Sequence, residues 1–97
     1  MAEFMIWRYE LGILIDPPIW PAHGTLWGHL VSDTSYDELH DFARMAGLSS
    51  RAFERDHYDY PASRYDALVA LGAEPVRSQE LVRRLVRAGL RRRAHEY

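Results

Sequence analysis

Residues 11–15 read Leu-Gly-Ile-Leu-Ile and present apolar side chains on both alternating faces of an extended chain. A strand of this kind is typical of a sheet whose two faces are both covered by other elements. It is expected to end at Asp16, because Pro17, Pro18 and Pro21 lack the N–H group that regular strand pairing needs. The run therefore predicts an internal strand of a layered fold, followed by a stiff loop.

Three further strands are predicted, over residues 26–32, 51–55 and 74–77. Three helices alternate with them. The first has an S-x-x-E capping pattern at Ser35 and Glu38 and a left-handed stop at Gly47, and the others are expected over residues 61–72 and 78–89. This alternation predicts a small α/β domain of two or three layers, with three helices and a mostly parallel sheet of three to four strands.

The chain of 97 residues is long enough for one hydrophobic core. We expect a single domain over residues 11–90, preceded by an extension of residues 1–10 and followed by a basic tail of residues 91–97. The apolar residues of the extension, Phe4, Ile6, Trp7 and Tyr9, suit an edge strand, a contact in a homodimer or an artefact of the start site.

Cysteine is absent, which excludes disulfides, thiolate nucleophiles and cysteine zinc sites, so any metal would need histidine and carboxylate ligands. No run approaches the roughly 20 apolar residues of a membrane span, and the expected location is cytoplasmic with no membrane partner. Charge is uneven: residues 1–74 carry twelve acidic residues against five arginines, and residues 75–97 carry two against seven. The basic end is either a solvated helix face or a surface for a phosphate backbone.

Acidic residues follow the predicted strands. Asp16 and Asp33 each come directly after a strand, and Asp56, His57 and Asp59 follow the third. If the strands are parallel, their carboxyl ends meet at one edge of the sheet and bring these carboxylates together. Such carboxylates need a cation, an arginine or a shared proton, and hard oxygen ligands with an imidazole suit Mg²⁺ or Mn²⁺ and also permit Zn²⁺. Asp33 is equally a helix cap, and Asp16 could simply begin a turn.

Several other side chains have two interpretations. His40 lies at the edge of a helix's apolar stripe, and is either a half-buried boundary residue or a general base or ligand at the site. His23 and His29 are too far apart to share one metal if His29 begins the second strand, so His29 either folds back with His23 or lies outside the site. Trp20 and Trp27 either pack on the proline loop or form a stacking platform.

The ordered motifs at residues 13–18, 29–33, 38–40 and 57–59, with Gly72, resemble the small bacterial and phage proteins grouped as domain of unknown function 4031. The resemblance covers residues 11 to about 90. It implies no activity. It implies that the family's polar pattern is carried here by Asp16, His29, Asp33, His40, His57 and Asp59.

Two functional hypotheses follow. In the first, the protein is a divalent-metal-dependent hydrolase of a phosphoester, either a nucleotide or a nucleic acid. Asp16 and Asp59 would hold the metal with His57 as a ligand or acid/base, while His40 would activate water and Arg64 would neutralise phosphate. In the second, the same groups form a buried network in a binding or adaptor module, which contacts nucleic acid or protein through the arginine-rich C-terminus.

Overall fold

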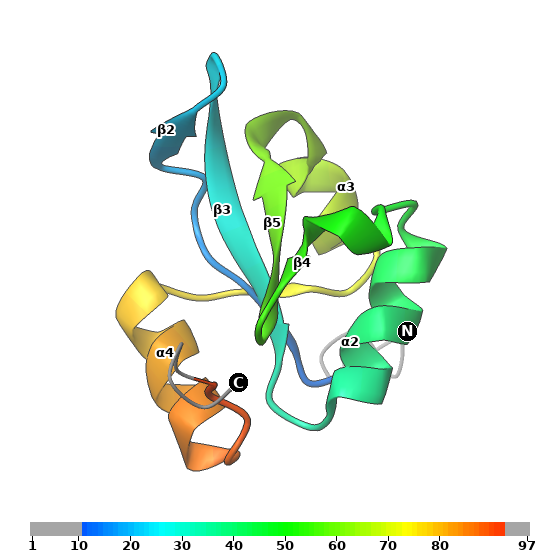
Figure 1. Ribbon diagram of the computed structural model, residues 1–97, viewed down its shortest axis with the longest axis vertical. Helices are drawn as coiled ribbons and strands as arrows, with labels where there is room; N and C mark the ends of the chain where they lie inside the picture. Colours follow the sequence, from blue (N-terminus) through cyan, green and yellow to red (C-terminus); the bar gives the residue numbers. More distant parts are fainter. Residues whose placement is uncertain (1–10, 93–97) are drawn as a thin grey trace, which may run out of the picture.

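The computed structural model describes residues 11–92 as three helices around a six-stranded sheet (Figure 1). The strands are β1 (Ile13–Ile15), β2 (Trp20–Ala22), β3 (Thr25–Ser32), β4 (Phe53–Glu54), β5 (His57–Pro61) and β6 (Glu74–Pro75). The helices are α2 (Tyr36–Met45), α3 (Tyr65–Ala70) and α4 (Ser78–Arg87), with 3-10 turns η1 (Ser50–Ala52) and η2 (Ala62–Arg64). The predicted extension, residues 1–10, and residues 93–97 of the predicted tail lie outside the described part. Among the described helices, none combines the length and apolar character that crossing a bilayer requires.

The sheet is mixed and mostly antiparallel, so the prediction of a mostly parallel sheet of three to four strands is wrong. Its order is β4-β5-β3-β1-β6 with β2 paired to β3, and only β1 and β6 run parallel. The chain returns from β1 through the short β2 and a turn at His23 and Gly24, both with positive φ, into β3, which then pairs antiparallel with β1. A tight turn can join only antiparallel strands, so no helix crosses over at this point.

Two predicted segments also differ locally. The strand expected over residues 51–55 shrinks to the two residues of β4, and most of the polar group at residues 56–59 lies inside β5 rather than in a loop. Pro21 does not prevent pairing, because β2 pairs with β3 alone and a proline is tolerated in such an edge strand.

Helices cover both faces of the sheet and give three layers. Strand residues of alternate parity face α2 and α3 on one side, in a core that includes Ile13, Ile15 and Leu30. On the other side Leu14 and Val31 pack against Leu81 and Leu85 of α4. We call this second side the α4 face. The sequence prediction of a central strand covered on both faces is confirmed, because Ile13, Leu14 and Ile15 are all fully buried.

The first helix begins where the capping pattern predicts. Ser35 is its N-cap, and its hydroxyl oxygen accepts a hydrogen bond from the Glu38 N–H at 3.1 Å. The reciprocal half of the capping box is absent. Glu38 instead accepts a hydrogen bond from the Ser32 hydroxyl at 2.7 Å, and the Ser32 oxygen accepts the Ser35 N–H at 3.1 Å. The helix is therefore tied to the end of β3 through one extra side chain.

Gly28 is required by a close approach in the core. It lies opposite Tyr60 in the β3–β5 register, and a Cβ at position 28 would come within 2.6 Å of two carbons of the buried Tyr60 ring. Tyr60 in turn donates a hydrogen bond to the Asp16 carbonyl oxygen. The missing side chain thus lets Tyr60 hold the backbone at the end of β1.

Gly28→Ala is expected to lower the free energy of unfolding by about 1–3 kcal/mol, because the added methyl group overpacks the core. Urea unfolding measures this loss. The same substitution in a Tyr60→Leu background should cost much less, since the ring atoms that would clash are gone. Equal losses in both backgrounds would show that Tyr60 is not the obstacle.

Candidate metal centre

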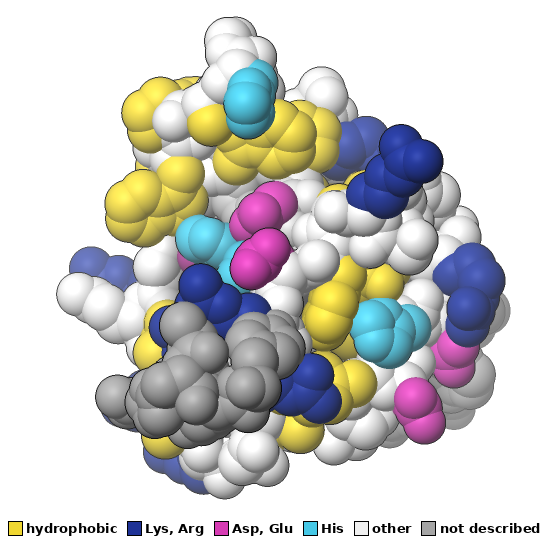
Figure 2. Space-filling view, in the orientation of Figure 1, with side chains coloured by type: hydrophobic (Ala, Val, Ile, Leu, Met, Phe, Trp, Pro, Cys, Tyr) yellow, Lys and Arg dark blue, Asp and Glu magenta, His cyan; other side chains and the backbone are white. Residues whose placement is uncertain are grey.

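Strand register gathers the polar side chains on the part of the α4 face that α4 leaves uncovered. In the β1–β3 ladder Ile15 pairs with Leu30, so the next residue, Asp16, lies opposite His29. His29 pairs with Asp59 on β5, and His57 lies two residues before Asp59 on the same face. Figure 2 shows acidic and histidine side chains together near the middle of the molecule, between hydrophobic side chains and a group of arginines.

The His29 ring is held by a buried carboxylate. Asp16 is only 1% exposed, and its Oδ2 accepts hydrogen bonds from His29 Nδ1–H and from the Ser78 hydroxyl, both at 3.0 Å. Its Oδ1 accepts the His29 backbone N–H at 2.6 Å. Because the carboxylate accepts a hydrogen bond from Nδ1–H, a neutral His29 ring carries its proton on Nδ1 and has the Nε2 lone pair available for a ligand.

The His57 ring is held in the same way by a different carboxylate. Asp56 is 2% exposed, and its Oδ1 accepts the His57 Nδ1–H at 2.8 Å. Its Oδ2 accepts the Arg92 backbone N–H at 2.8 Å and lies 3.9 Å from the Nε atom of Arg91. Asp56 follows Arg55, which has a φ of 57°, and these two residues form the turn between β4 and β5.

Both Nε2 atoms point to the same carboxylate oxygen. Asp59 Oδ1 lies 3.2 Å from His57 Nε2 and 3.9 Å from His29 Nε2. One ligand atom from each of these residues lies within 4.8 Å of the other two. Asp59 is 46% exposed, so the open side of the group faces solvent. Two imidazoles and one carboxylate with an open side match the donor set of a catalytic metal ion.

The charges of the group fit a cation. Burial alone would lower the pKa of His57, but its hydrogen bonds to Asp59 and Asp56 and their negative charges outweigh burial and raise that pKa above 6.5. The hydrogen bond from His57 lowers the pKa of Asp59, against the effect of burial, and the charges of His57 and His29 lower it further. In the metal-free protein, at pH values below this raised pKa, a proton on His57 offsets part of the negative charge that a bound metal ion would offset.

We expect metal affinity to fall with acidification, because a metal ion must displace this proton. Below the raised pKa of His57 the apparent affinity should weaken by about tenfold per pH unit. Without metal the sign is opposite: the His57 interactions stabilise the fold fully below pH 6.5 and are lost as pH rises through the raised pKa. Calorimetric Mn²⁺ titrations between about pH 5.5 and 8.5 measure the first effect. An affinity independent of pH would contradict it.

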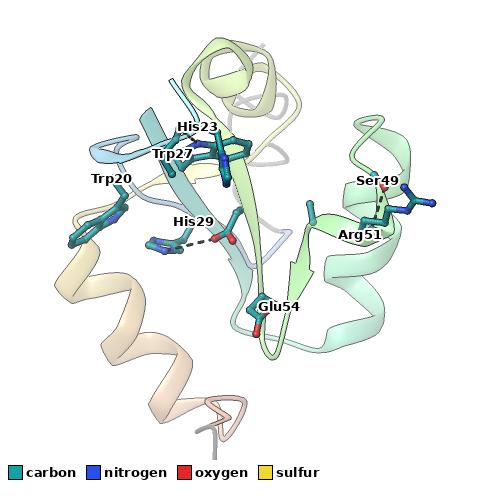
Figure 3. A pocket seen from close by; sticks show the side chains of 10 residues that line it. Trp20, His23, Trp27, His29, Ser49, Arg51 and Glu54 are labelled. Atoms are coloured by element: carbon teal, nitrogen blue, oxygen red, sulfur yellow. Dashed lines mark hydrogen bonds and ion pairs between the residues drawn. The ribbon is translucent and has the colours of Figure 1, made fainter. Parts of the chain in front are cut away.

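Two hollows flank the group. The larger, about 640 Å³, is lined on one side by Trp20, Trp27 and His23 and includes His29 and Asp59 (Figure 3). The smaller, about 210 Å³, extends toward α4 and the C-terminal segment. Its lining residues include Asp16, Trp20, His29, His57, Ser78 and Arg91.

The structure brings together three of the predicted site residues. His57 and Asp59 lie in the group, and Asp16 lies behind it, where it holds the His29 ring and offers no ligand atom to the metal position. His40 lies on α2 and its Nδ1 is 2.7 Å from the Tyr58 hydroxyl. Since Tyr58 alternates with His57 and Asp59 on β5, it points to the opposite face of the sheet.

Two other predicted residues have structural partners elsewhere. Arg64 donates a hydrogen bond to the Ala46 carbonyl, at the C-terminal end of α2. Asp33 does not cap α2, because Ser35 does; it accepts two hydrogen bonds from the Arg84 guanidinium, at 2.8 and 3.1 Å.

Two roles at the group are not among the sequence predictions, those of His29 and Asp56. Asp56 is expected there as one of several clustered carboxylates, not as the hydrogen-bond partner of the His57 ring. For His29 the sequence leaves two placements, folded back with His23 or outside the site. The structure shows a third, because its partners are across the sheet on β1 and β5. The available signal was the alternation of β5, where polar His57 and Asp59 flank the buried Tyr58. This alternation indicates a strand with one polar face, opposite which a polar His29 fits.

Comparisons with known proteins bear on the family alone. No curated protein and no solved structure matches the chain. The family described as "Protein of unknown function (DUF4031)" matches residues 13–88, which include every residue of the candidate metal centre and both carboxylates that support it. The chain belongs to the DUF4031 family.

Proposed function

We propose that this protein is a divalent-metal-dependent hydrolase that acts on phosphoesters, with His29, His57 and Asp59 as the metal ligands. One observation carries the proposal. Each imidazole has its Nδ1–H bound by a buried carboxylate, and both Nε2 atoms are directed at Asp59. Carboxylate–histidine pairs of this kind orient metal ligands. Two such pairs side by side, directed at one carboxylate, are typical of a metal site rather than of isolated structural histidines.

The donor set favours Zn²⁺ or Mn²⁺ over Mg²⁺, because imidazole nitrogen is a poor ligand for Mg²⁺. Three protein ligands leave room for water and for a substrate oxygen, and a bound divalent cation lowers the pKa of such a water toward neutrality. Asp16 and Asp56 keep the two rings in the ligating tautomer and orientation. Arg91 lines the smaller hollow beside His57 and could offset the charge of a phosphoryl group.

These roles differ from those predicted from the sequence. His57 and Asp59 stay as ligands, His29 replaces Asp16 at the metal, and Arg91 replaces Arg64 near the phosphate. The binding-module alternative, which uses the arginine-rich C-terminus, stays an untested prediction. In the described part of that region, Arg84 pairs with Asp33, and Arg92 stacks over the Tyr36 ring at 3.9 Å.

Metal binding is the first test. At a concentration of 100 times Kd, a bound ion stabilises the fold by about 2.7 kcal/mol. For a domain of this size that corresponds to a rise in Tm of roughly 10–20 °C. We expect this rise when Zn²⁺ or Mn²⁺ is added to chelator-treated full-length protein, and a much smaller one with Mg²⁺. No rise with any of the three ions would overturn the proposal.

Hydrolysis is the second test. Protein loaded with Mn²⁺ or Zn²⁺ should hydrolyse bis(4-nitrophenyl) phosphate and lose this activity when a chelator removes the metal. The Asp59→Asn variant, which removes the anionic ligand at a half-exposed position, is the inactive control. Metal binding without any chelator-sensitive hydrolysis of phosphoesters would leave a metal site but reject the hydrolase.

A further inference from the structure

The candidate metal centre lies where the two hollows meet. Trp20 and His29 line both of them, Trp27 lines only the larger, and Arg91 lines only the smaller. A ligand bound at the centre therefore has an aromatic wall on one side and a guanidinium on the other. The two linings indicate the substrate class, because the parts of a substrate on either side of its metal-bound group must suit an aromatic and a cationic surface.

The aromatic wall is exposed yet well supported. Trp20 is 50% exposed on the edge strand β2, and its ring centroid lies 6.1 Å from that of His29. Trp27 is paired with it across the hairpin, and the Trp27 indole N–H donates a hydrogen bond to the Ala22 carbonyl oxygen at 2.8 Å. Figure 3 shows both indoles beside the hollow that holds His29, whereas the Arg51 side chain is directed away from them. The cluster that α4 buries contains Leu14 and Val31 and neither tryptophan.

The opposite side is cationic. Within residues 11–92, the ion pair of Arg91 is with Asp56, whose Oδ2 lies 3.9 Å from the Arg91 Nε, and the Arg91 side chain is 39% exposed. A guanidinium carries five N–H donors in a planar fork, which suits the oxygens of an anion such as phosphate. A ligand that fits both sides has a planar aromatic group against the tryptophans and a phosphoryl group near the arginine. A nucleotide has both groups.

We infer that the substrate is a nucleotide unit whose base stacks on Trp20 and Trp27 while its phosphate lies between the metal centre and Arg91. The inference rests on the proposed function and adds a base-binding subsite to it. Trp20 is then a specificity-determining residue that contacts the base and takes no part at the metal. Stacking of this kind tolerates any base, because every base has a π face.

Calorimetry on full-length, Mn²⁺-loaded protein tests the subsite, with adenosine 5′-monophosphate, phenyl phosphate and inorganic phosphate as the probes. We expect the nucleotide to bind more tightly than either other probe. Trp20→Ala should weaken nucleotide binding by about 5- to 150-fold, the range for loss of one stacked base, and leave inorganic phosphate unchanged. A short single-stranded oligonucleotide, run in parallel, shows whether the nucleotide unit is recognised free or within a strand.

Leu26→Ala is the matched control. Leu26 is 45% exposed on the same hairpin, but it alternates with Trp27 and so points to the other face. This variant should bind the nucleotide like the parent protein. Equal affinity for nucleotide and inorganic phosphate, or no effect of Trp20→Ala, overturns the inference while metal binding and hydrolysis stand. Phenyl phosphate binding as tightly as the nucleotide overturns the assignment to a base.

The inference can also be separated from a failure of the proposed function. If Mn²⁺ does not bind, adenosine without phosphate is titrated into the metal-free protein and into Trp20→Ala. Binding that depends on Trp20 then supports the base subsite without a metal, and no binding rejects it.

Discussion

His29→Asn is expected to abolish the rise in Tm that Zn²⁺ or Mn²⁺ produces in the parent protein. The asparagine amide can still donate to the buried Asp16 carboxylate, as His29 Nδ1–H does, but it has no atom equivalent to Nε2. The variant therefore loses one of three metal ligands but keeps a hydrogen bond to the buried Asp16 carboxylate, so the fold should be largely preserved. Thermal unfolding with and without each metal measures the result, and calorimetry gives the affinity.

His40→Ala is the matched control for this variant. His40 is also a partly buried histidine with a side-chain partner, the Tyr58 hydroxyl, but it lies on the other side of β5 from the centre. It should lower stability slightly and leave the metal-induced rise intact. If His40→Ala removes the metal response and His29→Asn does not, the ligand assignment is wrong and the role predicted for His40 from the sequence regains support.

Asp56→Asn is expected to weaken metal binding by about 10- to 100-fold, although position 56 offers no ligand atom to the metal. The neutral amide keeps the shape of the side chain but no longer makes the His57 ring more basic through the Nδ1–H bond. It also removes the charge that faces Arg91 and the Arg92 N–H, which fasten the C-terminal segment to the β4–β5 turn. Competition with a chromogenic chelator measures the affinity.

Asp41→Asn controls for the general loss of a negative charge. Asp41 lies exposed on α2, and its ion pair is with Arg44, one turn away on the same helix. It should leave metal affinity unchanged. An Asp56→Asn variant that binds metal as tightly as the parent would show that the carboxylate under His57 serves only the fold.

The predictions that succeeded rest on local chemistry. Ser35 caps α2 because its hydroxyl meets an unpaired helix N–H three residues later, and Gly47 follows the helix with a φ of 77° that other residues rarely adopt. The double-sided strand over Ile13–Ile15 is likewise visible in three consecutive apolar residues. Each of these signals lies within a few residues of its effect.

The predictions that failed depend on which strands pair. The sequence reasoning expected Asp16 and Asp59 to meet at the carboxyl ends of parallel strands. Asp16 and Asp59 do lie on one face, but for a different reason. β3 runs antiparallel between β1 and β5 and places His29 between the two carboxylates. The expected meeting of Asp16, His40 and His57 holds for two of the three, since His40 packs on the other face.

The amino-acid sequence by itself determined the two ends of α2, at Ser35 and Gly47, and the double-sided central strand, because each follows from side chains within a few residues of one another. It placed residues 56–59 after a strand, whereas in β5 the spacing of two puts His57 and Asp59 on one face. Tertiary structure alone decided the strand order and with it the partners of His29, because pairing is chosen by the burial of whole faces against α2, α3 and α4 and not by any residue's local preference. A metal centre assembled across three strands is therefore visible only once the sheet has formed.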